Sequence, residues 1–182
     1  MTRDRRVHPH PARAADNFAP LSEHGLASYD STIEINVLAA KPGSAAQKRH
    51  VDAGVPTAFR HQPQAVKADD LVFISAQMAI DADGLIAAVD DPRQSRFGSR
   101  AQIQAEHIID NIEKLCQGAG TSLDNVVRVL QFHTDLDEFY PVYQVWERRL
   151  GGRPLPFSAV EVPAPLPVPG ATMMIEVWVY AP

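Results

Sequence analysis

Glu176 is the residue of this sequence best suited to chemistry. It interrupts residues 173–179, the most apolar strand-like run in the chain, where an ionised carboxylate without a partner would be costly. A carboxyl group held among apolar side chains is a candidate proton donor and acceptor. A second interpretation stays open, in which Glu176 lies on a strand face that is in contact with water. Glu161 is a similar case with weaker apolar flanks.

Few other side chains are candidates for a reactive or metal-binding role. His133 lies in a β-rich run and could titrate near neutral pH, although a lone strand histidine favours a structural role. The single cysteine, Cys116, excludes an internal disulfide and a multi-cysteine zinc site, and is expected to be a buried apolar residue. His8 and His10 have no third ligand nearby, so solvated histidines are favoured over a metal site. No metal and no cofactor are expected.

Composition limits the partners of the chain. Its 182 residues are 45% hydrophobic and carry a net charge of −5, which suits one globular domain with an extension. Residues 55–182 hold ten basic and sixteen acidic side chains, which argues against nucleic acid as a partner.

No run is apolar enough to span a membrane, and the N-terminus lacks the apolar core of a secretory signal. We expect a cytoplasmic protein without a membrane partner.

Residues 1–54 are expected to form an N-terminal extension before the main domain, residues 55–182. Residues 1–30 indicate a mobile arm, residues 31–39 alternate like a half-buried strand, and the polar residues 40–54 indicate a linker. Residues 32–39 share a pattern with residues 174–181. The pattern suggests the closing strand of a lost or separate preceding domain, or a chance similarity of two β-rich strands.

The element order of the main domain predicts an α+β fold. The expected order is two or three strands, a helix, a strand, a second helix and two closing strands, over residues 71–85, 99–118, 126–134, 136–150, 157–162 and 172–180. This order does not alternate as in a dinucleotide-binding fold, and favours a sheet with both helices on one face. The bare face is then most simply buried against another copy of the chain.

Several ordered motifs resemble those of the Rid family, also called the YjgF family. They are the Leu-Val-Phe-Ile-Ser-Ala-Gln of residues 71–77, the first-helix segment 107–113, the run 126–139, the Pro-Phe-Ser-Ala-Val-Glu-Val of residues 156–162, and the Ile-Glu-Val of residues 175–177. The resemblance covers residues 55–182. It implies a chorismate-mutase-like mixed sheet, a homotrimer with sites in the clefts between subunits, and hydrolysis of enamines or imines to carbonyl compounds and ammonia without a cofactor.

The sequence departs from the family pattern at the residues that hold the substrate. Phe157 stands where the family has an arginine that binds the substrate carboxylate, and Ala159 aligns with the small or thiol residue that the family has two places later. Gln62 aligns with a tyrosine and Tyr143 with an asparagine, so that only Glu176 matches. Loss of a bidentate contact to a carboxylate removes about 1.5–3 kcal/mol of binding. The resemblance therefore implies a more apolar pocket, suited to a ring or another uncharged group.

Two functions remain open from the sequence. The first is a hydrolase for an enamine or imine, in which Glu176 positions or activates water. Its expected substrate-binding residues are Ser75, Ala76, Tyr143, Phe157 and Ala159. The alternative is a small-molecule-binding trimer of the same fold without catalysis, because a fold alone does not decide its chemistry.

Overall fold

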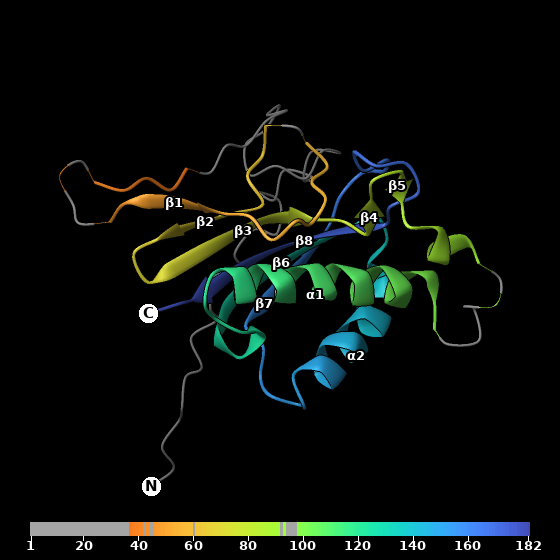
Figure 1. Cartoon of the computed structure of the whole chain (residues 1–182). Helices are drawn as coiled ribbons and strands as arrows, with labels where there is room; N and C mark the ends of the chain where they lie inside the picture. Colours follow the sequence, from red (N-terminus) through yellow and green to blue (C-terminus); the bar gives the residue numbers. More distant parts are fainter. Residues whose placement is uncertain (1–36, 42, 44–45, 60, 92, 94–97) are drawn as a thin grey trace, which may run out of the picture. The chain divides into compact units, whose positions relative to one another are not determined.

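The computed structural model describes residues 37–182, apart from residues 42, 44–45, 60, 92 and 94–97. The chain divides into two units, residues 1–38 and 39–182, and all of the described helices and strands lie in the second (Figure 1). Among the described residues, neither α-helix is long and apolar enough to cross a membrane.

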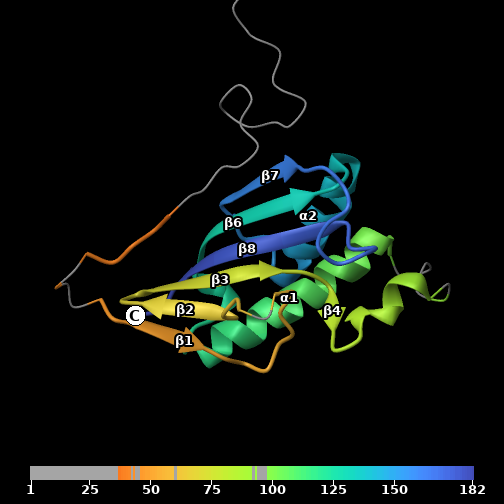
Figure 2. The ribbon, with the colours of Figure 1, turned by 90° about the horizontal axis from the view of Figure 1, so that it is seen from above.

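A six-stranded mixed sheet forms the centre of the second unit. Its strands lie in the order β1-β2-β3-β8-β6-β7 (Figure 2). Their bounds are Lys48–Val51 (β1), Ala65–Ala68 (β2), Leu71–Gln77 (β3), Val126–His133 (β6), Phe157–Glu161 (β7) and Met173–Tyr180 (β8). The β6 and β7 strands are parallel and the other neighbours antiparallel. The remaining two strands, Ile80–Asp81 (β4) and Gly84–Leu85 (β5), pair across the two-residue turn Ala82-Asp83.

Both long helices cover one face of this sheet, as the sequence predicts (Figures 1 and 2). They are Arg100–Gly118 (α1) and Phe139–Arg149 (α2), and a short 3-10 turn, Leu136–Glu138, leads into α2. Alternate residues of the central strands point into the core beneath the helices. The fully buried members on β3, β8, α1 and α2 include Val72, Ile175, Val177, Ile108, Ile112, Val142 and Trp146. The predicted α+β fold is confirmed.

A capping box begins α1 at Ser99, the residue at which the sequence predicts this helix to start. The backbone N–H of Gln102 donates to Ser99 Oγ at 3.2 Å, and the backbone N–H of Ser99 donates to Gln102 Oε1 at 3.0 Å. We expect Ser99→Ala to lower the free energy of unfolding by about 1 kcal/mol in urea denaturation. Ser122→Ala is the matched control, because Ser122 precedes a short 3-10 turn without a side-chain capping bond. An equal loss in both variants would contradict this assignment.

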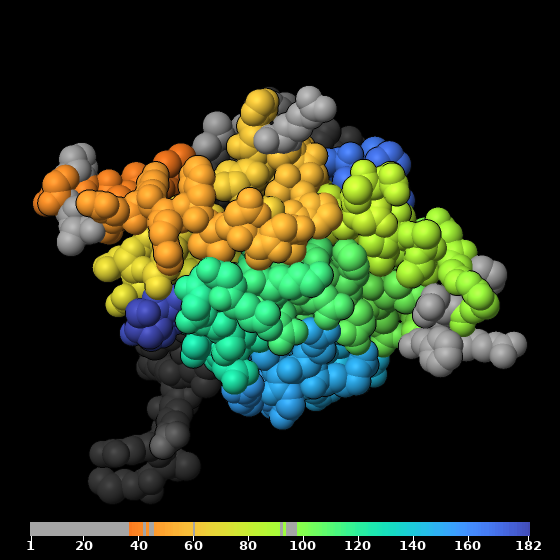
Figure 3. All heavy atoms as spheres, in the orientation of Figure 1, coloured from red at the N-terminus to blue at the C-terminus, as the bar shows by residue number. Residues whose placement is uncertain are grey.

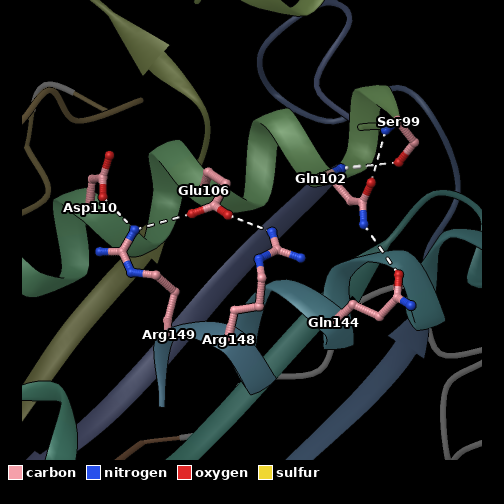
Figure 4. Close-up of polar contacts among 7 residues, drawn as sticks. All are labelled: Ser99, Gln102, Glu106, Asp110, Gln144, Arg148 and Arg149. Carbon is pink, nitrogen blue, oxygen red and sulfur yellow. Dashed lines mark hydrogen bonds and ion pairs between the residues drawn. The ribbon is translucent and has the colours of Figure 1, made fainter. Parts of the chain in front are cut away.

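Ion pairs fix α2 against α1 on the solvent side of the two helices (Figure 4). Arg149 reaches Asp110 at 2.6 Å, Glu113 at 2.8 Å and Glu106 at 3.2 Å, and its side chain is only 24% exposed. Arg148 adds a second pair to Glu106 at 2.7 Å. The two helices therefore present one joined surface beside the sheet, which Figure 3 shows as adjoining green and blue atoms.

The N-terminal part of the domain differs from the expected linker. Residues 48–51, within the segment 40–54, form β1 and pair with β2. This edge strand is only four residues long and includes the charged Lys48 and Arg49, and only Val51 is buried. It therefore shows almost no alternation of apolar and polar residues from which a strand could be predicted. The strand expected over residues 31–39 lies largely outside the described residues, and residues 37–39 form no strand.

Candidate functional site

A β-bulge places two of the predicted site residues opposite Glu176. The β3–β8 pairing joins Ile74 to Val177 and then Gln77 to Ile175, and the register shifts between these pairs. Ser75 and Ala76 together therefore face the single residue Glu176 on β8. Bulges re-aim side chains and free backbone groups from the ladder, and are frequent beside active sites. The Ser75 hydroxyl is already used, since it donates to the Pro63 carbonyl at 2.6 Å.

Glu176 lies half-buried on the face of the sheet that the helices leave uncovered. Its partner across β6 is Leu130. The next residue along this face of β8 is Trp178, which contacts the Phe73 ring edge-on at 5.1 Å and carries the Arg128 guanidinium over its ring at 4.7 Å. Arg128 is thus engaged with an aromatic ring. Among the described residues, no cation forms an ion pair with Glu176.

The surroundings of Glu176 are apolar over several strands. We call this surface the open face, and its half-buried or exposed apolar members are Val66, Phe73, Leu130, Phe132, Val160, Met174 and Trp178. An apolar surface that extends over several strands in this way marks an interaction site.

Phe157, Tyr143 and Ala159 lie on the other side of the sheet. The Phe157 ring packs against Tyr143 at 5.7 Å and against Phe139 at 5.4 Å between ring centres. Ala159 shares its face of β7, since register pairs Ala159 with the buried Gln131. Within one chain, the predicted site residues thus form two groups on opposite faces of the sheet. That these two groups line one pocket stays a prediction, and it requires a second copy of the chain to bring them together.

His133 is completely buried on the helix side of β6. Burial lowers the pKa of its imidazole, because the charged form loses its hydration. In the unfolded chain His133 binds a proton near pH 6.5, whereas in the folded chain it does so only at a lower pH. The free energy of unfolding is therefore highest above about pH 6.5 and falls as the pH decreases.

We expect the free energy of unfolding to fall by up to about 1.4 kcal/mol per pH unit below about pH 6.5, until His133 is protonated in the folded protein. Urea titrations between about pH 7.5 and pH 5.5 measure this slope. His133→Leu should flatten it, whereas the same substitution at the exposed His61 should not. A slope unchanged in His133→Leu would contradict this account.

The remaining candidates carry no reactive group in the described residues. Cys116 is buried, as predicted, and burial together with the charge of Glu113 raises the pKa of its thiol to about 12. A thiol with this pKa is a poor nucleophile at neutral pH. No cluster of histidine, cysteine and carboxylate side chains in the described part of the chain has the arrangement of a metal site.

Gln131 is not among the residues that the sequence singles out, although it is as completely buried as His133. A signal was present, because the order Val129-Leu130-Gln131-Phe132-His133 alternates and so places Gln131 and His133 on the face of Val129. The buried orientation of that face only follows from the structure.

Comparisons with known proteins agree with this fold. Residues 54–181 match the family model for endoribonuclease L-PSP. The protein HMF1 of Saccharomyces cerevisiae is 30% identical over 121 residues, which are 66% of this chain and 84% of HMF1. The RutC family protein y4sK of Sinorhizobium fredii is 32% identical over 92 residues, half of this chain and 65% of that relative, just under two thirds of its length.

A solved structure leads to the same family. The Rid-family protein YyfA from Yersinia pestis superposes with a TM-score of 0.62 at 26% identity, over 74% of this chain and all of YyfA. The family model and this shared fold confirm the resemblance seen in the sequence motifs: the chain belongs to the endoribonuclease L-PSP family, which includes the Rid proteins.

Proposed function

We propose that this protein hydrolyses an enamine or imine to a carbonyl compound and ammonia, without a cofactor, in clefts between the subunits of a homotrimer. The observation that carries the proposal is the position of Glu176, a carboxylate without an ion-pair partner among the described residues, opposite the Ser75–Ala76 bulge on an apolar face. Cytoplasmic location stays a prediction.

The reaction requires two proton transfers that one carboxylate can perform. Glu176 takes a proton from water as the oxygen attacks the imine carbon, and the nitrogen accepts that proton. In the resulting carbinolamine, Glu176 takes the hydroxyl proton and passes it to the amine nitrogen. The C–N bond then breaks, ammonia leaves with that proton, and the oxygen forms the carbonyl group. The Ser75 N–H already donates to the Gln64 carbonyl, and the Ser75 carbonyl accepts from Gln77. The backbone of Ala76 in the bulge is therefore the group proposed to hold the substrate beside Glu176.

A second copy completes the pocket in this proposal. The open face of one subunit, with Glu176, packs against the β7 edge of the next, which brings Phe157, Tyr143 and Ala159 towards it. This arrangement would explain why the two groups lie on opposite faces of one chain. Because Phe157 stands in the place of an arginine, the pocket suits a substrate without a carboxylate.

The proposal is tested by comparing two substrates that are generated in situ. One is 2-aminoacrylate, which carries a carboxylate, and the other is an uncharged aromatic imine. Ammonia release by the full chain should exceed the buffer rate for the aromatic imine, and by a larger factor than for 2-aminoacrylate. Buffer rates for both would leave the alternative, a small-molecule-binding trimer without catalysis.

A further inference from the structure

In the β3 bulge, a side chain takes the place of a backbone hydrogen-bond partner. Opposed residues of an antiparallel pair can exchange two backbone N–H···O bonds. Ser75 lies one residue beyond the last β2–β3 pair, and its N–H donates to the Gln64 carbonyl at 3.1 Å. The Ser75 carbonyl accepts instead from the side-chain amide of Gln77 at 2.9 Å. Gln77 therefore supplies a bond that a regular ladder would take from the neighbouring strand.

The buried position of Gln77 itself depends on the bulge. Gln77 is 2% exposed and pairs with Ile175 on the helix side of the sheet. Because Ile74 also faces the core, uninterrupted alternation would place Ala76 there and turn Gln77 to the open face. A buried amide requires a hydrogen-bond partner, and Gln77 finds one in the carbonyl at the start of the bulge. The bulge buries Gln77, and the Gln77 amide in turn holds the bulge.

Ser75 is also fixed from the side of β2. Its hydroxyl donates to the Pro63 carbonyl at 2.6 Å. Gln64, which accepts from the Ser75 N–H, is held in turn, since its side-chain oxygen accepts from the Ala53 N–H at 2.8 Å. Both donors and the carbonyl of Ser75 are thus used within the chain. Ser75 serves to fix the strand at the bulge, and Gln77 is the only one of these partners that lies on the far side of it.

We infer that Gln77 is a positioning residue for the proposed hydrolysis, on which this role rests. Its amide fixes the Ser75 carbonyl, keeps two residues opposite the single Glu176, and so presents the Ala76 backbone to the substrate. Without the amide, the Ser75 carbonyl can accept from the Gln64 N–H as in a regular ladder. That exchange favours one-to-one pairing with β8 and withdraws the Ala76 backbone from Glu176. Gln77 acts through Ala76, because its own side chain lies on the face opposite Glu176.

Gln77→Met tests this role, because methionine has nearly the length of glutamine and lacks the amide. KM for the uncharged aromatic imine should rise about tenfold, which corresponds to one hydrogen bond lost to the substrate. A merely structural role would lower the folded fraction and the apparent kcat but would leave KM unchanged. Gln104→Met is the matched control, since Gln104 is also buried but donates to Thr172 at 3.2 Å instead of to the bulge. Its KM should stay within about twofold of the unsubstituted value.

Two structural measurements do not depend on catalysis. In the full unsubstituted chain, the Gln77 side-chain amide protons should exchange with solvent at least about tenfold more slowly than those of the exposed Gln117. A crystal structure of Gln77→Met should show the Ser75 carbonyl turned towards the Gln64 N–H and the register shift lost or moved. An unprotected Gln77 amide in the unsubstituted chain would overturn the inference even if Gln77→Met did not fold. An unchanged bulge in the variant would overturn it as well.

The kinetic outcomes separate this role from the proposed function. Ammonia release at the buffer rate by the unsubstituted chain would count against the hydrolysis itself. Hydrolysis by the unsubstituted chain together with an unchanged KM in Gln77→Met would overturn only the role of Gln77. An equal rise of KM in Gln77→Met and Gln104→Met would also overturn it, because the effect would then follow from the loss of any buried amide.

Discussion

Glu176→Gln is expected to lower the rate of imine hydrolysis by about 100-fold or more, which is the usual contribution of one positioned proton-transfer group. Glutamine has nearly the same shape and keeps an oxygen that can orient water, but it cannot take the proton that water must lose. The loss should therefore fall mainly on kcat, with KM changed little. Ammonia release from the uncharged aromatic imine, measured at saturating substrate, is the readout.

Glu161→Gln provides the matched control. Glu161 is the other carboxylate that the sequence marks on an apolar strand, but it is exposed and its side chain accepts from the backbone N–H of Leu136. The same chemical change there should leave hydrolysis within about twofold, since surface substitutions rarely disturb a distant site. A Glu176→Gln enzyme as active as the unsubstituted protein would remove the carboxylate from the mechanism.

The helices and long strands of this chain could be predicted because each is encoded locally. Ser99 and Gln102 have the types and spacing of a capping box, and α1 begins after them. Helical spacing of apolar residues up to Gly118 marked the length of α1 in the same way. Alternation along β8 puts Glu176 on the face opposite the buried Ile175 and Val177, a position that the local sequence is enough to determine.

The candidate site could be predicted only in part, because its geometry depends on pairing between distant strands. Nothing in residues 71–77 indicates a bulge, which exists only in the register of β3 against β8. It also could not be predicted from the sequence that Phe157 and Glu176 lie on opposite faces of the sheet. That separation follows from the parallel pairing of β7 with β6, a contact between segments some 30 residues apart in sequence.

Trp178→Asp is expected to convert the proposed homotrimer into monomers. Trp178 lies on the open face between Phe73 and Arg128, so an aspartate there would remove the ring that packs against Phe73 and place a charge, offset only by Arg128, where two copies would pack. The cost of such a charge is several kcal/mol per site, and a symmetric trimer would incur it three times. Light scattering coupled to gel filtration should show the mass falling from three chains to one chain of 20.0 kDa.

Two further variants tie this effect to the open face. Val160→Asp changes a residue of the open face that is 40% exposed in the single chain, so it should dissociate the trimer without disturbing the fold. Gln117→Asp introduces the same charge at an exposed residue of α1, away from the open face and from the β7 edge, and should leave the proposed trimer intact. A trimer that survives both open-face variants would mean that other surfaces join the copies, and a cleft between Glu176 and the next subunit's β7 would lose its physical basis.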